Sequence, residues 1–200
     1  MHLRITSNGD CPMSTLKVDT IQGKTTSGTV AMPAGSIVQV QATTSDAQTA
    51  VSGVSFSDFM SVAITPKFSS SKIHVSCSIN LSGQNTTGGS TDEGIRYSGV
   101  KLFRDTTQIA VNSNTSGNRT AVWFSANTIG QTTNEAYRMA NSSGQFLDSP
   151  STTSAITYKV QIGQSSQTSS YVVTNTSPVD DNNPYTHHGV STLTVMEIKQ

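Results

Sequence analysis

The chain has 200 residues, 12 % of them charged, and a formal net charge of +0. Its Lys and Arg residues are few and scattered, so the sequence excludes the basic cluster of a nucleic-acid binder or of an anionic membrane surface. Ser and Thr make up about 30 % of the chain, and this uncharged, strand-favouring composition predicts a β protein rather than a disordered one.

Residues 1–35 are predicted to form an extended N-terminal arm. The segment is polar, and its apolar residues are too sparse to build a core of their own. Leu16, Val18 and Ile21 are therefore expected to pack against copies of themselves in a trimer or to dock against another protein, and a disordered tail is the alternative. No stretch has the apolar length of a secretory signal or a membrane span, which predicts assembly in a cytoplasm without membrane insertion.

Residues 36–200 are predicted to form a head of about eight to ten short strands joined by polar turns. Alternating apolar residues, the signature of half-buried strands, mark six runs: SIVQVQ, MSVAIT, KIHVSCSINL, ITYKVQI, SYVVT and VSTLTVMEI. A turn at Asp105 and Thr106 predicts a hairpin, and a slip of the apolar phase at Gly99 predicts a bulge there. No segment is convincing as an amphipathic helix. The pattern favours an antiparallel β-sandwich or jelly roll.

The last strand carries apolar side chains on both faces. Met196 and Ile198 lie on one phase with two Thr residues, and Leu193 and Val195 lie on the other with Glu197. A strand with one face in water needs only one apolar phase, so this pattern predicts shielding by sister subunits. The predicted trimer interface is Leu193, Val195, Met196 and Ile198.

The two cysteines do not imply a disulfide framework. Cys77 lies on the apolar phase of a strand and is expected to be a small core residue, while Cys11 lies in the polar arm.

Five phrases occur in the same order in small structural and tail-fibre-like proteins of marine bacteriophages, including cyanophages. They are MSTLKVDTIQGKTTSGTVAMPAGSIVQVQ, SVAITPKFSSSKIHVSCSIN, KLFRD, FLDSPSTTSAITYKVQI and STLTVMEIK. The chain resembles this family over residues 13–199. The family typically begins at the position of Met13, so residues 1–12 are an extension or come from an alternative start, and no role is assigned to them.

The resemblance implies a virion component, with the tail as the expected position. An N-terminal arm would attach it to other tail or capsid proteins, and a C-terminal jelly-roll head of the C1q or TNF type would form a homotrimer. A host-surface glycan or protein is the expected further partner if the head recognises the host. The alternatives are a capsid decoration or head-fibre protein, a glycan-degrading tailspike enzyme and a cell-encoded adhesin.

No catalytic residue, metal site or cofactor is predicted. The sequence has no P-loop, Rossmann glycine fingerprint, HExxH or GxSxG motif. The acidic pairs lie in polar loops, where neighbouring carboxylates are expected to be solvated rather than set for glycan cleavage. The adjacent histidines match no known metal-ligand spacing. These residues are Asp92 with Glu93, Asp180 with Asp181, and His187 with His188.

Receptor contact would use exposed aromatic residues, and the sequence does not identify which. Trp123, Tyr97 and Tyr185 are the candidates. Tyr185 lies in a loop and is expected to be exposed, whereas Trp123 is expected to belong to the core.

Overall fold

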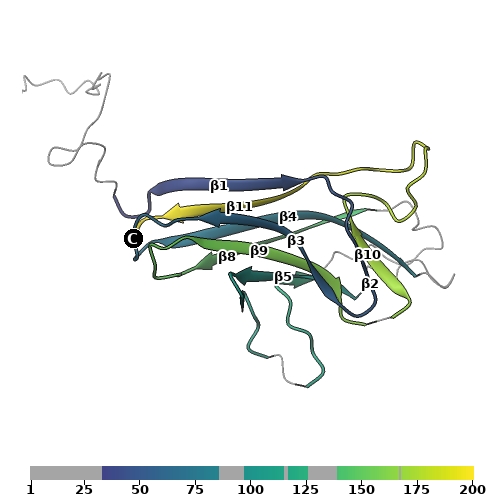
Figure 1. Ribbon diagram of the computed structural model, residues 1–200, viewed down its shortest axis with the longest axis horizontal. Coiled ribbons are helices and arrows are strands. Elements are labelled where there is room, and N and C mark those ends of the chain that lie inside the picture. The colour runs from purple at the N-terminus through teal and green to yellow at the C-terminus, as the bar shows by residue number, and fades with distance from the viewer. Residues whose placement is uncertain (1–32, 86–96, 115–116, 126–138, 167) are drawn as a thin grey trace, which may run out of the picture. The chain divides into compact units, whose positions relative to one another are not determined.

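The computed structural model of the protein describes residues 33–85, 97–114, 117–125, 139–166 and 168–200. The chain divides into two compact units, Met1–Pro33 and Ala34–Gln200, and all the described strands belong to the second. These strands form two antiparallel sheets, consistent with a β-sandwich (Figure 1). The predicted all-β class is confirmed. Within the described residues there is no helix that is long and apolar enough to span a membrane.

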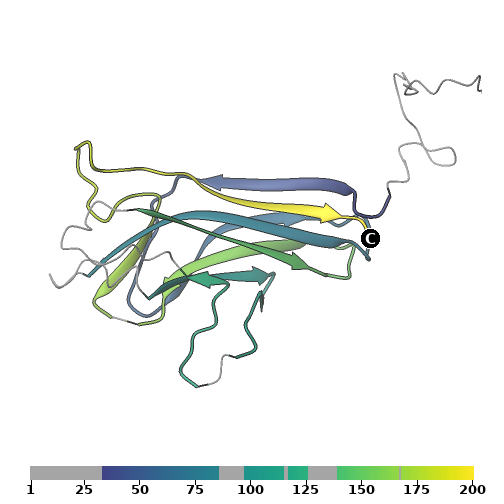
Figure 2. The ribbon, with the colours of Figure 1, turned by 180° about the vertical axis from the view of Figure 1, so that it is seen from behind.

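The first sheet has six strands and is organised around the long strand β4. Its residues Ile73–Ser78 pair with β11 along one edge and with β8 along the other, and its last residues pair with β10. Figure 2 shows β1 beside β11, the last strand of the chain. The order is β1 (Ile37–Ser45), β11 (Ser191–Ile198), β4 (Lys72–Asn85), β10 (Ser170–Thr174) and β2 (Ala50–Ser52), with β8 (Ala140–Asp148) on the free side of β4.

The second sheet has five strands, with β9 and β5 at its centre. Two short strands, β6 and β7, share the edge of β5 that faces away from β9. The order is β3 (Phe56–Ile64), β9 (Ile156–Gln164) and β5 (Ser98–Arg104), followed by β6 (Thr107–Ile109) and β7 (Phe124–Ser125).

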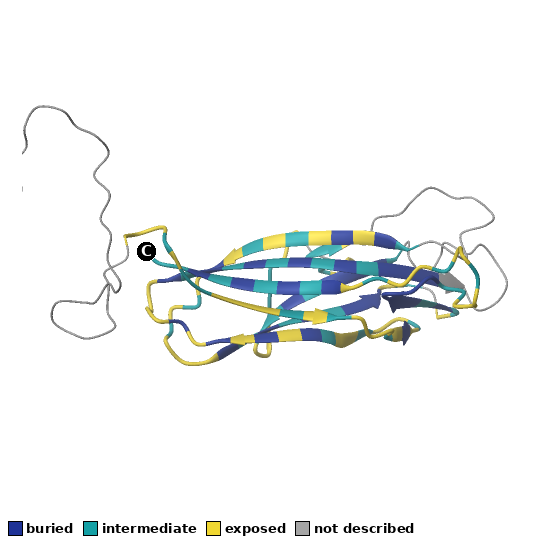
Figure 3. Cartoon of the chain, turned by 90° about the horizontal axis from the view of Figure 1, so that it is seen from above, coloured by how far each residue is buried: buried dark blue, intermediate teal, exposed yellow. Residues whose placement is uncertain are grey.

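The core lies between the sheets and is built by alternation along the strands (Figure 3). Every second residue of β4 from Ile73 to Leu81 is buried, and the residues between them are only half-buried. The same period holds in β9, from Ile156 to Ile162. Because successive side chains of a strand point to opposite faces, this alternation gives each sheet one apolar inner face. The predicted strands in these runs are confirmed.

Of the two local predictions near β5, the hairpin and the bulge, only the hairpin agrees with the structure. The hairpin is confirmed, since Arg104 pairs with Thr107 across a two-residue turn in which Asp105 has a φ of 53°. The predicted bulge at Gly99 is wrong: β5 keeps one register with β9 from Ser98 onward. The missing side chain at Gly99 instead makes room for Val122, whose Cγ1 would lie 2.7 Å from a Cβ at this position.

A buried carboxylate ties the connection between β3 and β4 to the first sheet. Glu197 of β11 has no exposed surface. Its Oε1 accepts hydrogen bonds from the backbone N–H groups of Lys67 at 2.8 Å and Phe68 at 3.2 Å, and its Oε2 accepts one from the Gln39 amide at 2.6 Å. Burial alone would raise the pKa of Glu197, but these donors, Lys67 first, outweigh burial and hold the pKa below its ordinary value.

A second carboxylate joins the two sheets directly. Asp148 of β8 is buried and accepts hydrogen bonds from Nη1 of Arg104 at 2.7 Å and from the Tyr158 hydroxyl at 2.7 Å. Arg104 lies on β5 and Tyr158 on β9, so both donors come from the opposite sheet. Burial, followed by the hydrogen bond to Asp148, raises the pKa of Tyr158 far above its ordinary value.

Candidate functional site

The outer face of the six-stranded sheet carries a row of three apolar residues and one histidine that crosses four strands. The register places Val40 of β1 opposite Met196 of β11, Met196 opposite His74 of β4, and His74 opposite Leu147 of β8. Directly paired residues of a sheet point to the same face, so these four side chains are neighbours. We call them the cross-strand row.

The cross-strand row is open to solvent in the single chain. Val40 is 50 % exposed and Leu147 is 48 % exposed, and Ile37, which pairs with the half-buried Ile198 at the end of the same face, is 54 % exposed. Farther along this face the outward positions are mostly hydroxyls and amides. On β1, β8, β11 and the first half of β4, Lys72 is the single outward residue with a permanent charge. A face that is apolar in part and nearly uncharged suits a protein–protein contact.

The structure separates the four residues of the predicted trimer interface into two groups. Leu193 and Val195 have no exposed surface and belong to the core of the single chain, so they are not available to a sister subunit. Met196 and Ile198 lie on the outer phase and are half-buried. The two phases of β11 are thus apolar for different reasons. The inner phase belongs to the core, and only the outer phase lies on the surface where a partner could bind.

Several predicted residues lie outside the described residues. They are the arm residues Leu16, Val18 and Ile21, together with Cys11 and the acidic pair Asp92 and Glu93. Cys77 is described: it is buried in the core as a free thiol, and burial raises its pKa to about 12. It therefore has little thiolate character at neutral pH.

The loop between β10 and β11 holds the remaining acidic pair. His188 Nε2 lies 2.9 Å from an Asp180 carboxylate oxygen, and Asp181 accepts hydrogen bonds from Asn183 and, at 2.9 Å, from the Thr186 hydroxyl. The loop side chains thus satisfy one another. Among the described residues no group of three or more His, Cys, Asp or Glu side chains is placed to hold a metal ion.

Two other predicted surface residues in that loop are exposed. His187 points into solvent, as does Tyr185, which is 63 % exposed. Tyr97, the third aromatic candidate, is half-buried immediately before β5.

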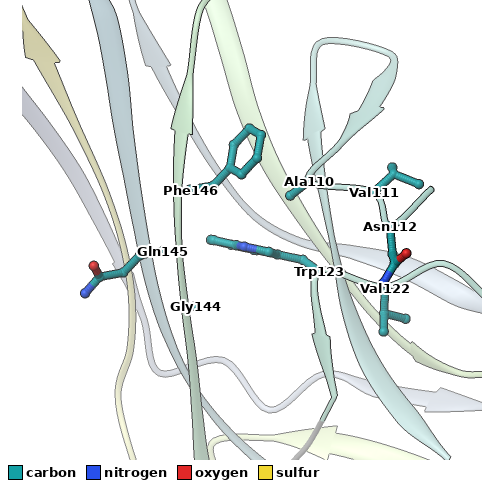
Figure 4. Close-up of a pocket in the computed structure, with 8 residues that line it drawn as sticks. All are labelled: Ala110, Val111, Asn112, Val122, Trp123, Gly144, Gln145 and Phe146. Atoms are coloured by element: carbon teal, nitrogen blue, oxygen red, sulfur yellow. The ribbon is translucent and has the colours of Figure 1, made fainter. Parts of the chain in front are cut away.

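Trp123 is half-buried and lies at an open hollow, a site that the sequence pattern does not reveal. Its ring packs edge-to-face with Phe124 at a centroid distance of 5.0 Å. Figure 4 shows the indole reaching from its own segment toward Gly144 and Phe146 of β8. A side chain at Gly144 would overlap Phe124 and approach the indole within 3.0 Å, so the glycine allows both rings to lie against the strand. The hollow has a volume of about 600 Å³ and is lined by Ala110, Val111, Asn112, Val122, Trp123, Gly144, Gln145 and Phe146.

Comparison of the chain with models of protein families found no match, and comparison with curated proteins found none.

Proposed function

We propose that this protein is a structural and attachment component of a bacteriophage virion, of the tail-fibre type and without enzymatic activity. Residues 1–35 attach it to another virion protein, and residues 36–200 form a jelly-roll head that assembles as a homotrimer. The observation that carries the proposal is the strand order, together with the nearly uncharged outer face of the six-stranded sheet.

The strand order supports a jelly roll. Without β2, β6 and β10, one sheet reads β1-β11-β4-β8 and the other β3-β9-β5-β7. Along the chain, the connections from β3 to β4, from β4 to β5, from β7 to β8 and from β8 to β9 all cross between the sheets. Eight strands that pass between two sheets in this way are what a jelly roll would have, and this supports the proposal.

The outer face of the six-stranded sheet supports self-association. A contact with another copy would remove the exposed apolar surface of Val40, Leu147 and Ile37 from water, at about 25 cal/mol for each Å² buried. The near absence of charge on this face means that two copies approach without like-charge repulsion. The number three comes from the resemblance to C1q- and TNF-type heads.

The native mass of the full chain in solution tests the trimer. Sedimentation equilibrium or light scattering is expected to give three times the chain mass of 21.1 kDa. Replacing Leu147 by Lys is expected to yield folded single copies, because the side chain is 48 % exposed in one chain and only the assembled form would bury the new charge.

Ala63→Lys is the matched control for this variant. Ala63 is exposed on the outer face of the five-stranded sheet, between two buried residues of β3, and its replacement should leave the trimer intact. A wild-type protein of single-chain mass at micromolar concentration would rule out the proposed assembly. Trimers of unchanged stability in the Leu147 variant would rule out this face as the contact.

Removing residues 1–35 is expected to abolish incorporation into particles and to leave the head folded. The reason is that the strands of the sandwich begin at Ile37, so the deletion removes no strand residue and, among the described residues, one backbone hydrogen bond to the head, from the Gly35 N–H to the Lys199 carbonyl oxygen at 2.8 Å. Circular dichroism of the truncated protein and its quantity in purified particles are the two measurements. Truncated protein that still enters particles at the wild-type level would contradict the role proposed for the arm.

A further inference from the structure

The hollow at Trp123 is chemically uniform in one respect. None of the eight residues that line it has a side chain that can carry a charge, and five of them have aliphatic or aromatic side chains: Ala110, Val111, Val122, Trp123 and Phe146. An ionic ligand would lose its hydration there without meeting an opposite charge, which is costly. The hollow therefore favours an uncharged ligand with a substantial apolar face.

The hollow also offers hydrogen-bonding groups, which a purely apolar ligand would leave unused. Asn112 is exposed at its border, and its Oδ1 accepts a hydrogen bond from the Asn114 N–H at 2.8 Å. Its Nδ2 group has no partner within the part of the chain that the structure describes, so it can donate to a ligand. Gln145 differs, because its side chain points to the opposite side of β8 (Figure 4).

The backbone of β8 supplies further groups. Among the described strands β8 pairs with β4 alone, so it is an edge strand and alternate peptide groups along its other edge lack a ladder partner. Gly144 has no side chain of its own and lines the hollow, with the Phe124 and Trp123 rings against it. A ligand lying against the Trp123 ring is therefore next to peptide donors and acceptors.

We propose that this hollow binds an uncharged saccharide. A pyranose ring has an apolar C–H face that packs on an aromatic ring, and its hydroxyls can both donate and accept hydrogen bonds at its rim. In this proposal the Trp123 and Phe146 rings pack against the apolar face of the sugar. The Asn112 amide and the peptide groups at the edge of β8 form hydrogen bonds with the sugar hydroxyls. The hollow, at about 600 Å³, is in the range of small-molecule sites and has room for more than one sugar ring.

The inference deepens the attachment role proposed above and rests on it for the biological use of the ligand. Binding to one copy is expected to be weak, with a Kd of roughly 1 mM, because the site is open and a small sugar has few contact atoms. Three sites on one trimer would then gain strength by avidity on a glycan-covered surface.

Trp123 is the single tryptophan of the chain, so its fluorescence reports on this hollow alone. The full-length protein is titrated with maltose, lactose and chitobiose, with glucuronate as a charged sugar and cyclohexanol as an apolar ring without a sugar's hydroxyls. At least one neutral disaccharide is expected to change the emission saturably, while glucuronate and cyclohexanol do not. Asn112→Ala should weaken that binding about five- to tenfold, the usual effect of one lost hydrogen bond.

Tyr185→Ala is the matched control, since this exposed aromatic residue lies in the loop between β10 and β11 and does not line the hollow. It should bind sugar as the wild type does. The inference is overturned if no neutral sugar changes the emission, if cyclohexanol titrates as well as the sugars, or if Asn112→Ala binds with unchanged affinity. If the emission changes when only the protein concentration is raised, without sugar, the hollow is filled by a second copy of the chain. That outcome would also overturn the saccharide inference.

Native mass measured on the same samples separates the two proposals. If the protein is a trimer and binds none of the sugars, the proposed assembly stands and the saccharide site is refuted. If the protein is a single chain and binds a sugar, the saccharide site stands and the assembly is refuted.

Discussion

Replacing Glu197 by Ala is expected to lower the free energy of unfolding by about 3–4 kcal/mol. The carboxylate has no exposed surface and accepts hydrogen bonds from two backbone N–H groups and the Gln39 amide. The variant leaves these three donors without their acceptor and opens a space beneath β11. Urea unfolding followed by circular dichroism at neutral pH measures the loss.

Glu197→Gln is the matched variant, because it keeps the shape and one acceptor oxygen. Its Oε1 can still receive the backbone donors of Lys67 and Phe68, while its amide group no longer accepts from Gln39. We expect it to lose less than the Ala variant and more than a surface substitution such as Ala63→Lys. Equal stability of Glu197→Ala and the wild type would show that the carboxylate does not hold the connection between β3 and β4.

The Glu197 carboxylate makes the free energy of unfolding depend on pH, with lower stability in acid. Its pKa in the folded protein lies below the ordinary value of 4.5. Its contribution to stability is therefore fully present above pH 4.5 and is lost as the pH falls through the lower, folded-state pKa. The difference in unfolding free energy between the wild type and Glu197→Gln should accordingly be large at pH 7 and shrink as the pH falls below 4.5. A constant difference over this range would contradict the low pKa.

Gly163→Ala is expected to be the most damaging single-methyl change, at about 3 kcal/mol or more. A Cβ at Gly163 of β9 would overlap the carbonyl oxygen of Ser55 and would lie 2.6 Å from Cα of Phe56. Both are backbone atoms next to or within β3, so the contact cannot be relieved by turning a side chain. The strands β3 and β9 would have to separate. Thermal unfolding of the variant measures the cost.

Gly117→Ala separates steric overlap from backbone strain. Gly117 has a φ of 75°, and a Cβ there would meet no atom within 4 Å. An Ala at this position carries the strain of a left-handed conformation, roughly 1–2 kcal/mol, and nothing more. If Gly163→Ala is no more destabilising than Gly117→Ala, the close approach of β3 to β9 is not what requires the glycine.

Much of the sandwich follows from the sequence where one phase of a strand is consistently apolar. Ile73 to Leu81 and Ile156 to Ile162 predict β4 and β9 because the alternation is unbroken. β8 was not predicted, since its inner positions begin with Ala140, Ser142 and Gly144. Small inner residues leave space for Trp123 and Phe124, and a pattern based on large apolar residues does not detect them.

The candidate surface was predictable only in part. The outward phase of β11 identifies Met196 and Ile198, but alternation does not say which phase is the core, and so Leu193 and Val195 were placed in the interface. Val40 and Leu147 join the row only through the register of β1 and β8. Register between strands far apart in the sequence depends on tertiary packing, which no local pattern records.

The pairing of β1 with β11 has a consequence for biosynthesis. The first strand of the sandwich, beginning at Ile37, lies beside the last, which ends at Ile198. Until β11 has emerged from the ribosome, β1 lacks its pairing strand among the described residues, and Lys72–Ser78 of β4 lack one of theirs. Folding is therefore expected to be slow, as for other chains dominated by contacts between distant residues. Unfinished copies would expose unpaired strand edges, so crowded expression favours aggregates over soluble heads.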